Sequence, residues 1–536
     1  MASMNSAICF SAESLESKEV RPFALFRDHV GPALEARRKD LESMYAQLLG
    51  RPEIDPVFLT GVTILQMMER LPDRQAITAC RYDARWRLAL DLPQMWKGID
   101  PSTLVYFRRR LAEHGLAGVA LEAGLEAMRR AGYLRRHGAI RIDSTHVLGC
   151  IAHLSRLECV RETLRLALDA LVAYGGVSAW EPWLSRYAER NPQELRNASI
   201  ERLRSTLDQA GRDALEVLVK AQALGETLSR SEPVTLLRRV FDEQFQIMEG
   251  GALQQRAAMP SGAVHNPHDP QAKWSTKGTL GKDGWVGYKL QVCETAPENT
   301  RQPGEPTEAV ITAALTQPAI TSDHGSLVPV LAIHEQGGQV KPEEVFTDAG
   351  YVSAPALKDA NAQGYRLTGP VGAPPHSGKR FGSDSFTVDI PNRQATCPAG
   401  KISSECSRIA ETQTQKTYYY FAWPSSLCTL CPSKGQCLST KKQTPFRSLQ
   451  VGEDHMIVQA RRVLCKTSEY QRRMHRRNGI EGTHSELSRG YHMRQSRYRG
   501  LQKTDIQMQF TASACNLRRW ASRLCWLNRQ TAMKAA

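Results

Sequence analysis

Three acidic residues stand where a phosphoryl-transfer enzyme needs carboxylates. Asp348 follows the run Val345-Phe346-Thr347 and precedes Gly350, which predicts a buried strand that ends in a free carboxylate and a sharp turn. Asp143 follows a similar short β-branched run, and Glu481 lies in a strongly basic helical region. Carboxylates of this kind form all-oxygen sites for Mg²⁺, and two ions about 3.5–4 Å apart hold the attacking and leaving oxygens of a phosphoryl transfer in line.

Each acid also has a structural alternative. From its own stretch alone, Asp348 is as good a cap for a helix that starts near Ala354 as it is a catalytic residue. Asp323, which follows a predicted strand over residues 309–320, is the main rival for the site, although a capping role before a helix at residue 327 fits it better. Glu486 is a weaker rival of Glu481 because it lacks the Ile-Glu-Gly context.

Four short motifs occur in one order along the chain. They are Ile142-Asp143-Ser144-Thr145, Trp285-Val286-Gly287-Tyr288-Lys289, Thr347-Asp348-Ala349-Gly350-Tyr351, and Ile480-Glu481-Gly482 followed by Ser496-Arg497-Tyr498-Arg499-Gly500. This ordered set resembles the DDE transposases of bacterial insertion sequences. Residues 50–56 and 100–104 resemble the amino-terminal domain of the same proteins, so that the resemblance runs from about residue 25 to about residue 522.

The resemblance implies both a fold and an activity. The fold would be mixed α/β (α+β), with an RNase H-like core, a helical amino-terminal domain, a helical insertion and a small Cys-rich, zinc-ribbon-like insertion. Asp143, Asp348 and Glu481 would be the catalytic residues and would hold two Mg²⁺ (or Mn²⁺) ions. The partners would be double-stranded DNA, namely the element's terminal inverted repeats and the target, and further copies of the chain in a synaptic complex. The setting would be the bacterial cytoplasm, at the nucleoid.

Basic residues near the acids are candidate DNA contacts. The candidate DNA contacts are Lys289, Arg477, Arg489, Arg497 and Arg499. In related transposases a helical signature places tyrosine seven residues before the glutamate, arginine four before, and lysine or arginine seven after. Here those positions hold Met474, Arg477 and Ser488, so only the arginine matches. Arg489 is a substitute for the last position, although one residue is about 100° around a helix.

Composition favours a polyanionic partner. The 536 residues include 70 Lys plus Arg against 55 Asp plus Glu, for a net charge of +15. The amino terminus has neither the basic start nor the apolar segment of a signal peptide, and no apolar run is long enough to span a bilayer. The 13 cysteines are odd in number and scattered, which fits a reducing cytoplasm better than a disulfide framework.

The periodicity of apolar residues predicts seven segments. They are a loose tail (1–24), a helical DNA-binding or assembly domain (25–135), the first core strand (136–150), a helical insertion (151–258), the continued core (259–394), a Cys-rich insertion (395–445), and carboxyl-terminal helices that carry Glu481 and a basic surface (446–536). The insertion's Glu158 and Glu162 are expected on its solvated face. A continuous helix is expected over residues 455–489.

Five cysteines gather in the Cys-rich insertion. Cys428 and Cys431 form a CxxC, with Cys397 upstream and Cys437 downstream, while Cys406 is the odd one out. Four thiolates around a structural Zn²⁺ would stabilise a segment that is too small to fold alone. Free thiols are the main alternative, and redox chemistry is a weaker one.

Two functional alternatives remain open at this point. One is a nuclease with the same fold and metals that cuts DNA but never joins it. The other is a DNA-binding regulator derived from a transposase, without catalysis. His146 and His484 lie near the acids in sequence, but packing or hydrogen bonding is a more common role for such histidines than metal binding.

Overall fold

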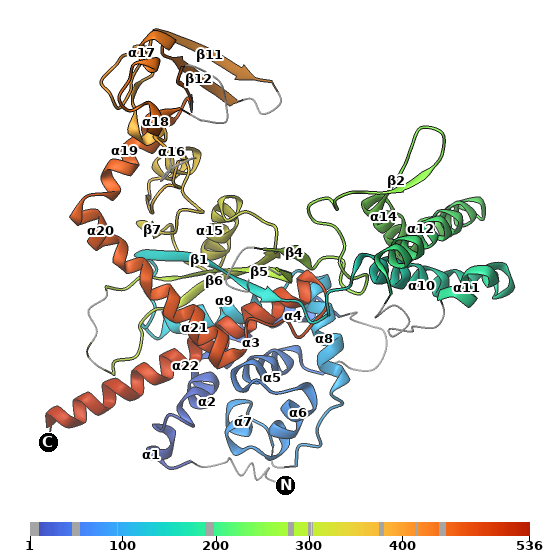
Figure 1. Ribbon diagram of the computed structural model, residues 1–536. Helices are drawn as coiled ribbons and strands as arrows, with labels where there is room; N and C mark the ends of the chain where they lie inside the picture. Colours follow the sequence, from blue (N-terminus) through green and yellow to red (C-terminus); the bar gives the residue numbers. More distant parts are fainter. Residues whose placement is uncertain are drawn as a thin grey trace.

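The computed structural model describes residues 10–45, 54–93, 95–187, 198–276, 284–298, 302, 304–374, 380–412, 416–438 and 446–535. The expected mixed α/β fold is confirmed. A central sheet separates a helical amino-terminal part from a Cys-rich part, and a bundle of helices projects to one side (Figure 1). Residues 50–53 of the amino-terminal motif lie outside the described residues.

The central sheet has six strands. Its order is β6-β5-β1-β7-β8, and β4 pairs with the same edge of β5 as β6 does. The pairs β1–β5 and β5–β6 are antiparallel, whereas β1–β7 and β7–β8 are parallel. The bounds are β1 Ala139–Leu148, β4 Lys273–Ser275, β5 Trp285–Thr295, β6 Ile311–Pro318, β7 Glu344–Phe346 and β8 Arg366–Thr368.

Helices cover both faces of this sheet. The alternation of Ile140 and Ile142 with polar residues directs these two side chains to one face, where they pack with α15 (Leu327–Gln336) and the region of α16 (Ala354–Ala362). The Ser353 side chain accepts a hydrogen bond from Ala356 N and so caps α16. The other face packs against α9, α21 (Gly479–Tyr491) and α22 (Leu501–Ala535).

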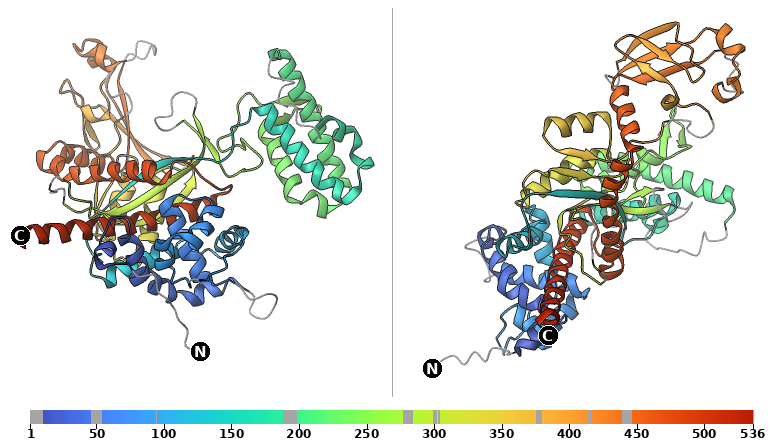
Figure 2. Two further views of the ribbon diagram at one scale, coloured as in Figure 1. Left: turned by 90° about the horizontal axis from the view of Figure 1, so that it is seen from below. Right: turned by 90° about the vertical axis from the view of Figure 1, so that its left-hand side faces the viewer.

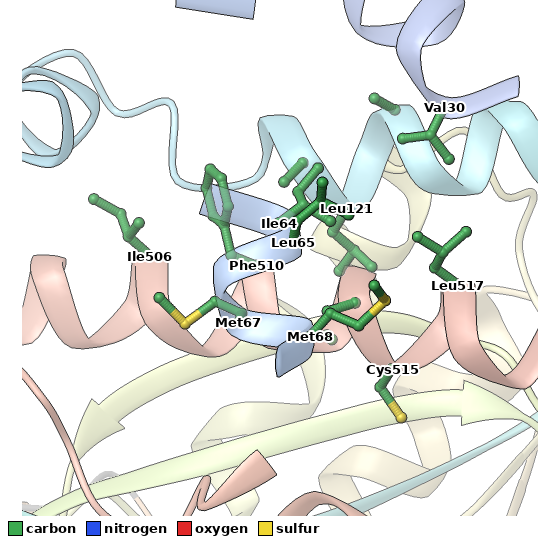
Figure 3. Close-up of a cluster of buried hydrophobic side chains, with 14 of the residues drawn as sticks. Val30, Ile64, Leu65, Met67, Met68, Leu121, Ile506, Phe510, Cys515 and Leu517 are labelled. Atoms are coloured by element: carbon green, nitrogen blue, oxygen red, sulfur yellow. The ribbon is translucent and has the colours of Figure 1, made fainter. Parts of the chain in front are cut away.

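The amino-terminal helices share one core with α22. Ile64, Leu65, Met67 and Met68 of α5 lie among Ile506, Phe510 and Leu517 of α22 (Figure 3). This core is continuous with the face of β5 that carries Leu290 and Val292. The elements are α1 Ala12–Leu15, α2 Arg21–Leu25, η1 Phe26–Val30, α3 Gly31–Glu35, α4 Arg38–Glu42, α5 Pro56–Glu69, α6 Asp73–Tyr82, α7 Ala84–Ala89, α8 Ser102–Glu113 and α9 Val119–Arg130.

The helical insertion has a hydrophobic core of its own. Its helices form a separate bundle that stands off the sheet in Figure 1 and in the left view of Figure 2. Long amphipathic helices α10, α12 and α14 pack on one another and bury Leu164, Leu168 and Leu218. The elements are α10 Arg156–Gly175, η2 Ser178–Trp180, α11 Glu181–Tyr187, α12 Ile200–Ala223, α13 Glu226–Ser229, α14 Glu232–Gln244, β2 Phe245–Ile247 and β3 Leu253–Gln255.

The Cys-rich part is a small β subdomain. Its core is formed by Phe386, Phe421, Trp423, Leu449 and Val451, around the three-stranded antiparallel sheet β11-β12-β13. Helices α19 and α20 lead from it back to α21 (Figure 1). The elements are η4 Ser383–Ser385, β9 Thr387–Asp389, β10 Gln394–Thr396, β11 Glu405–Glu411, β12 Lys416–Ala422, α17 Ser425–Thr429, α18 Lys434–Cys437, β13 Ser448–Gly452, α19 His455–Cys465, α20 Ser468–Met474 and η5 His475–Asn478.

Several expectations about elements need correction. The region 455–489 is not one helix, because Thr467 caps a new helix, α20, and a short 3₁₀ turn, η5, precedes α21. The strand that carries Asp143 does not stop there but runs on to Leu148. Part of the expected loose tail is ordered, since Phe23 and Ala24 are buried in α2. Glu162 is buried beside His268 rather than solvated, whereas Glu158 is exposed as expected and closes the capping box of α10.

Candidate active site

Strands β1 and β7 bring Asp143 and Asp348 to the same edge of the sheet. The parallel register pairs Arg141 with Phe346. Two residues further on, beyond the last paired residue of β7, each chain reaches an aspartate, and Asp348 is close enough to raise the pKa of Asp143. The β7 pairing ends at Phe346, and the backbone N–H of Gly350 then donates to Asp348 Oδ1 at 2.8 Å, which fixes this carboxylate in the turn. The two acids therefore flank the point where the parallel strands separate.

Helix α21 carries Glu481 to the same place. Arg477, one turn before Glu481, contacts both acids: its Nη2 lies 3.0 Å from Asp143 Oδ2 and 3.7 Å from Glu481 Oε1. The Glu481 side chain is 65 % exposed, whereas that of Asp143 is 11 % exposed. The three predicted acids thus approach one site from two strands and a helix, with one exposed and one buried carboxylate sharing a guanidinium.

The charge of this site is unbalanced. Burial raises the pKa of Asp143 to about 6, Arg477 opposes that rise, and the nearby carboxylates of Asp348 and Glu481 add to it. Tyr351 lies fully buried behind the acids, and burial together with Asp323, Asp143 and Asp348 raises its pKa well above its usual value. A cation at this edge of the sheet would relieve the repulsion between these carboxylates.

A fourth carboxylate, Asp323, borders the site. A Cβ atom on Gly350 would stand 3.0 Å from both Asp323 Oδ2 and Asp348 Oδ1, so these two acids enclose the glycine. Asp323 makes no side-chain cap to the turn that follows it, so its expected capping role is wrong. Its Oδ1 instead lies 3.0 Å from Lys289 Nζ, and both side chains are buried.

The predicted DNA contacts divide into two groups. Lys289 is buried by its pair with Asp323 and cannot contact DNA in this structure, which corrects that prediction. Arg497 is partly buried and donates to the Leu71 carbonyl oxygen at 3.0 Å, so that it joins the core to the amino-terminal helices. Arg489 and Arg499 are exposed, and Arg477 is partly exposed beside the acids.

The two histidines near the acids differ in their surroundings. His146 packs against Trp285 in a tilted arrangement, with ring centroids 5.5 Å apart, as a packing residue would. His484 is buried on α21, and its Nε2 lies 4.0 Å from Asp143 Oδ2. Burial, helped by Arg494 and Arg477 and opposed by Glu294, lowers the pKa of His484 to about 4. Its ring is therefore neutral at neutral pH, and the 4.0 Å contact is not an ion pair.

A buried polar network, which no local sequence signal predicted, holds α21 against the sheet. Glu294 of β5 is fully buried and accepts hydrogen bonds from Arg141 Nε at 2.6 Å, Thr483 Oγ1 at 2.7 Å and Arg519 Nη1 at 2.9 Å. Burial opposes ionisation of Glu294, but Arg519 and Arg141 outweigh it and hold the pKa below its usual value. Since Thr483 lies two residues after Glu481, this network fixes the helix that presents the third acid.

The Cys-rich subdomain gathers four thiols around one small cavity. Cys397, Cys428, Cys431 and Cys437 line this cavity of about 30 Å³, and Cys406 does not. The backbone N–H of Arg447 donates to Cys428 Sγ at 3.4 Å. Burial raises the pKa of Cys437, Arg447 opposes the rise, and the other three thiols add to it. As they stand, however, no three His, Cys, Asp or Glu side chains in the described ranges meet at metal-ligand distances, here or beside Asp143.

Known protein families match both ends of the chain. The family model described as the transposase DDE domain matches residues 396–521, a range that includes Glu481 and all four of these cysteines. The transposase domain DUF772 matches residues 11–110, the amino-terminal helices. Asp143 and Asp348 lie outside both matched ranges. No curated protein matches the chain.

These two families agree with the resemblance of the short motifs. Transposases act on DNA, and the DDE family generally uses divalent metal ions. None of the described helices is long and apolar enough to cross a membrane. The chain belongs to the DDE transposases of insertion sequences, enzymes that cleave DNA and transfer its strands during transposition.

Proposed function

We propose that Asp143, Asp348 and Glu481 are the catalytic residues of this transposase and hold two Mg²⁺ (or Mn²⁺) ions. The observation that carries the proposal is the meeting of these acids: parallel strands β1 and β7 lead to Asp143 and Asp348 at the same edge of the sheet, and one guanidinium contacts Asp143 and Glu481. Burial raises the pKa of Asp143, and the neighbouring carboxylates of Asp348 and Glu481 add to the rise; a bound cation would offset both effects, which supports the proposal. Divalent ions bound there would lower the pKa of water and stabilise charge on the phosphate oxygens.

The residues around the acids would orient the DNA. Arg477 is suited to hold a phosphate beside the carboxylates, since a guanidinium binds two oxygens at once. Exposed Arg489 and Arg499 would extend this basic surface along the duplex. Water cleaves the phosphodiester at the element's end, and the freed 3′-hydroxyl attacks target DNA. No covalent bond to the protein is needed in either step.

We also propose that the central sheet is an RNase H-like core. If β1, β5, β6, β7 and β8 are numbered 1 to 5 in chain order, they lie in the sheet in the order 3-2-1-4-5. The second of them, β5, is antiparallel to both of its neighbours. This arrangement supports the proposal. The core would then be interrupted by the helical insertion after β1 and by the Cys-rich subdomain after β8.

For the Cys-rich subdomain we propose a structural Zn²⁺ held by Cys397, Cys428, Cys431 and Cys437. The four thiols share one cavity, and a backbone N–H bond to a cysteine sulfur, such as that of Arg447 to Cys428, is suited to a thiolate. The zinc would hold together a subdomain with a small apolar core.

Copies of the chain would assemble on the two element ends in a synaptic complex.

A strand-transfer assay tests the proposed function. Element-end DNA with a free 3′-hydroxyl, taken from the DNA that flanks the gene, is incubated with a supercoiled target and Mg²⁺ or Mn²⁺. Wild type should cleave and join, and Asp348→Asn should do neither while DNA binding persists. Asp359→Asn, an exposed change on α16, is the matched control and should stay active.

The same assay separates the alternatives. Cleavage without joined product would favour the nuclease, and DNA binding without metal-dependent cleavage would favour the regulator. Joined product from Asp348→Asn at the wild-type rate would remove Asp348 from the catalytic set.

A further inference from the structure

We propose that His484 supplies a nitrogen ligand to the divalent ion held at Asp143, so that the site has an imidazole in addition to its carboxylates. This inference rests on the proposed function, because it adds a residue to the same site. Three features of His484 support the inference. They are its position on α21, the lack of hydrogen-bond partners for its ring nitrogens among the described residues, and its distance from Asp143.

His484 lies on the side of α21 that faces the acid of β1. It follows Glu481 by three residues, so both side chains lie on neighbouring sides of the helix. The His484 side chain is 7 % exposed, while that of Glu481 points to solvent. One turn of α21 therefore carries the exposed carboxylate of Glu481 and the buried imidazole of His484, both next to Asp143.

Neither ring nitrogen of His484 has a hydrogen-bond partner within the described part of the chain. Buried polar atoms are nearly always paired, and an unpaired one costs stability. An imidazole ring nitrogen is a common metal ligand. By contrast, the nearby side chains of Arg141, Thr483 and Arg519 are engaged with Glu294. Among the described residues, both ring nitrogens of the buried His484 are thus left without a hydrogen-bond partner.

The distance to Asp143 suits an ion between the two side chains. His484 Nε2 and Asp143 Oδ2 are 4.0 Å apart. Metal–nitrogen and metal–oxygen bonds of about 2.0–2.2 Å place two ligands of one ion roughly 3–4 Å apart, depending on the angle between them. The separation is too long for a hydrogen bond and falls within this range.

Arg477 competes with an ion for Asp143. Its Nη2 lies 3.0 Å from the same oxygen, Asp143 Oδ2. Its side chain is 21 % exposed, so it can turn outward to a DNA phosphate and leave Asp143 to the ion. An imidazole ligand also changes metal preference, because nitrogen donors suit Mn²⁺ better than Mg²⁺, which keeps oxygen ligands.

Pulsed electron paramagnetic resonance of Mn²⁺ bound to the full chain tests the inference. Echo modulation should show coupling of Mn²⁺ to a ¹⁴N nucleus in wild type, and uniform ¹⁵N-histidine labelling should convert it to ¹⁵N coupling. His484→Asn should lose the coupling and bind Mn²⁺ more weakly, with a smaller change for Mg²⁺. The matched control is His146→Asn, which removes the neighbouring imidazole and should keep the coupling.

The outcomes are distinguishable from failure of the proposed site. Mn²⁺ binding that disappears in Asp143→Asn, but shows no nitrogen coupling in wild type, would refute the role of His484 and leave the carboxylate site standing. Coupling that survives in His484→Asn would also refute it. Absence of any Asp143-dependent Mn²⁺ binding would overturn both. Should the Asn variant not fold, His484→Leu fills the same buried space without an unpaired polar atom and gives the same comparison.

Discussion

Replacing Gly479 with alanine should displace Glu481, although the substitution leaves Glu481 itself unchanged. Gly479 is the first residue of α21, and a Cβ there would stand 2.0 Å from Nη1 and 2.4 Å from Cζ of Arg141. Arg141 has no room to withdraw, because it is fully buried and bonded to Glu294 and to the Arg476 carbonyl oxygen at 2.8 Å. Either its guanidinium or the start of α21 must move.

The cost follows from the contacts that are lost. A hydrogen bond to a charged group contributes about 1.5–3 kcal/mol, and breaking a buried ion pair costs about 3–5 kcal/mol. Alanine regains about 1 kcal/mol through its higher helix propensity. The variant should therefore be less stable locally by about 2–4 kcal/mol. Displacement of α21 would also move Glu481 away from Asp143, so metal-dependent cleavage should fall.

Hydrogen exchange of peptides from β1 and α21 measures this change, since local opening free energies are read from protection. The matched control is Gly482→Ala on the same helix, where nothing lies within 4 Å of the added methyl. This change should increase protection by about 0.5–1 kcal/mol. Equal or greater protection of α21 in Gly479→Ala than in wild type would refute the argument that Arg141 needs a glycine there.

Three further predictions concern single groups. Because the folded-state pKa of Asp143 is raised to about 6 from 3.8, folding takes up a proton between these values, and the penalty for its charge is largest above pH 6. Urea unfolding should therefore show Asp143→Asn to be more stable than wild type at pH 7, by a margin that shrinks as the pH falls to 4.5. Cys428→Ser should lose the zinc, about one ion per chain by metal analysis, whereas Cys406→Ser should keep it. Arg477→Ala should weaken DNA binding and make its log–log salt slope shallower by about 0.9, and an unchanged slope would remove it from the phosphate contacts.

Local signals predicted the elements that depend on local chemistry. The helices expected to start at residue 327 and near Ala354 are α15 and α16, which begin at Leu327 and Ala354. The strand-end positions of Asp143 and Asp348 suggested their proximity, although β1 continues past Asp143 because its later residues pair with β5 as far as Gly287. The break between α19 and α20 has no glycine or proline to mark it, so residues 455–489 were read as one helix.

Long-range charge pairing could not be predicted from one sequence. Lys289 looked like a DNA contact in its motif, but it is neutralised by Asp323 from a segment beyond the next strand. Glu294 looked like the polar end of a strand, yet its partners come from β1, α21 and α22. Nothing local distinguishes such a buried carboxylate from an exposed one, because the tertiary structure supplies both its burial and its counter-ions.

The place at which the helical insertion joins the sheet has a consequence for how the enzyme reaches its folded state. The chain leaves β1 after Leu148 and later returns as β5 beside it, where Gly149 N donates to Val286 O at 2.9 Å. Pairing these strands closes a very long loop, and non-local pairings of this kind are slow to form. The insertion has its own apolar core, so it can become ordered early and draw the two strands together. The speed with which the acid-bearing strand finds its neighbour would then be set by a bundle that contributes none of the three acids.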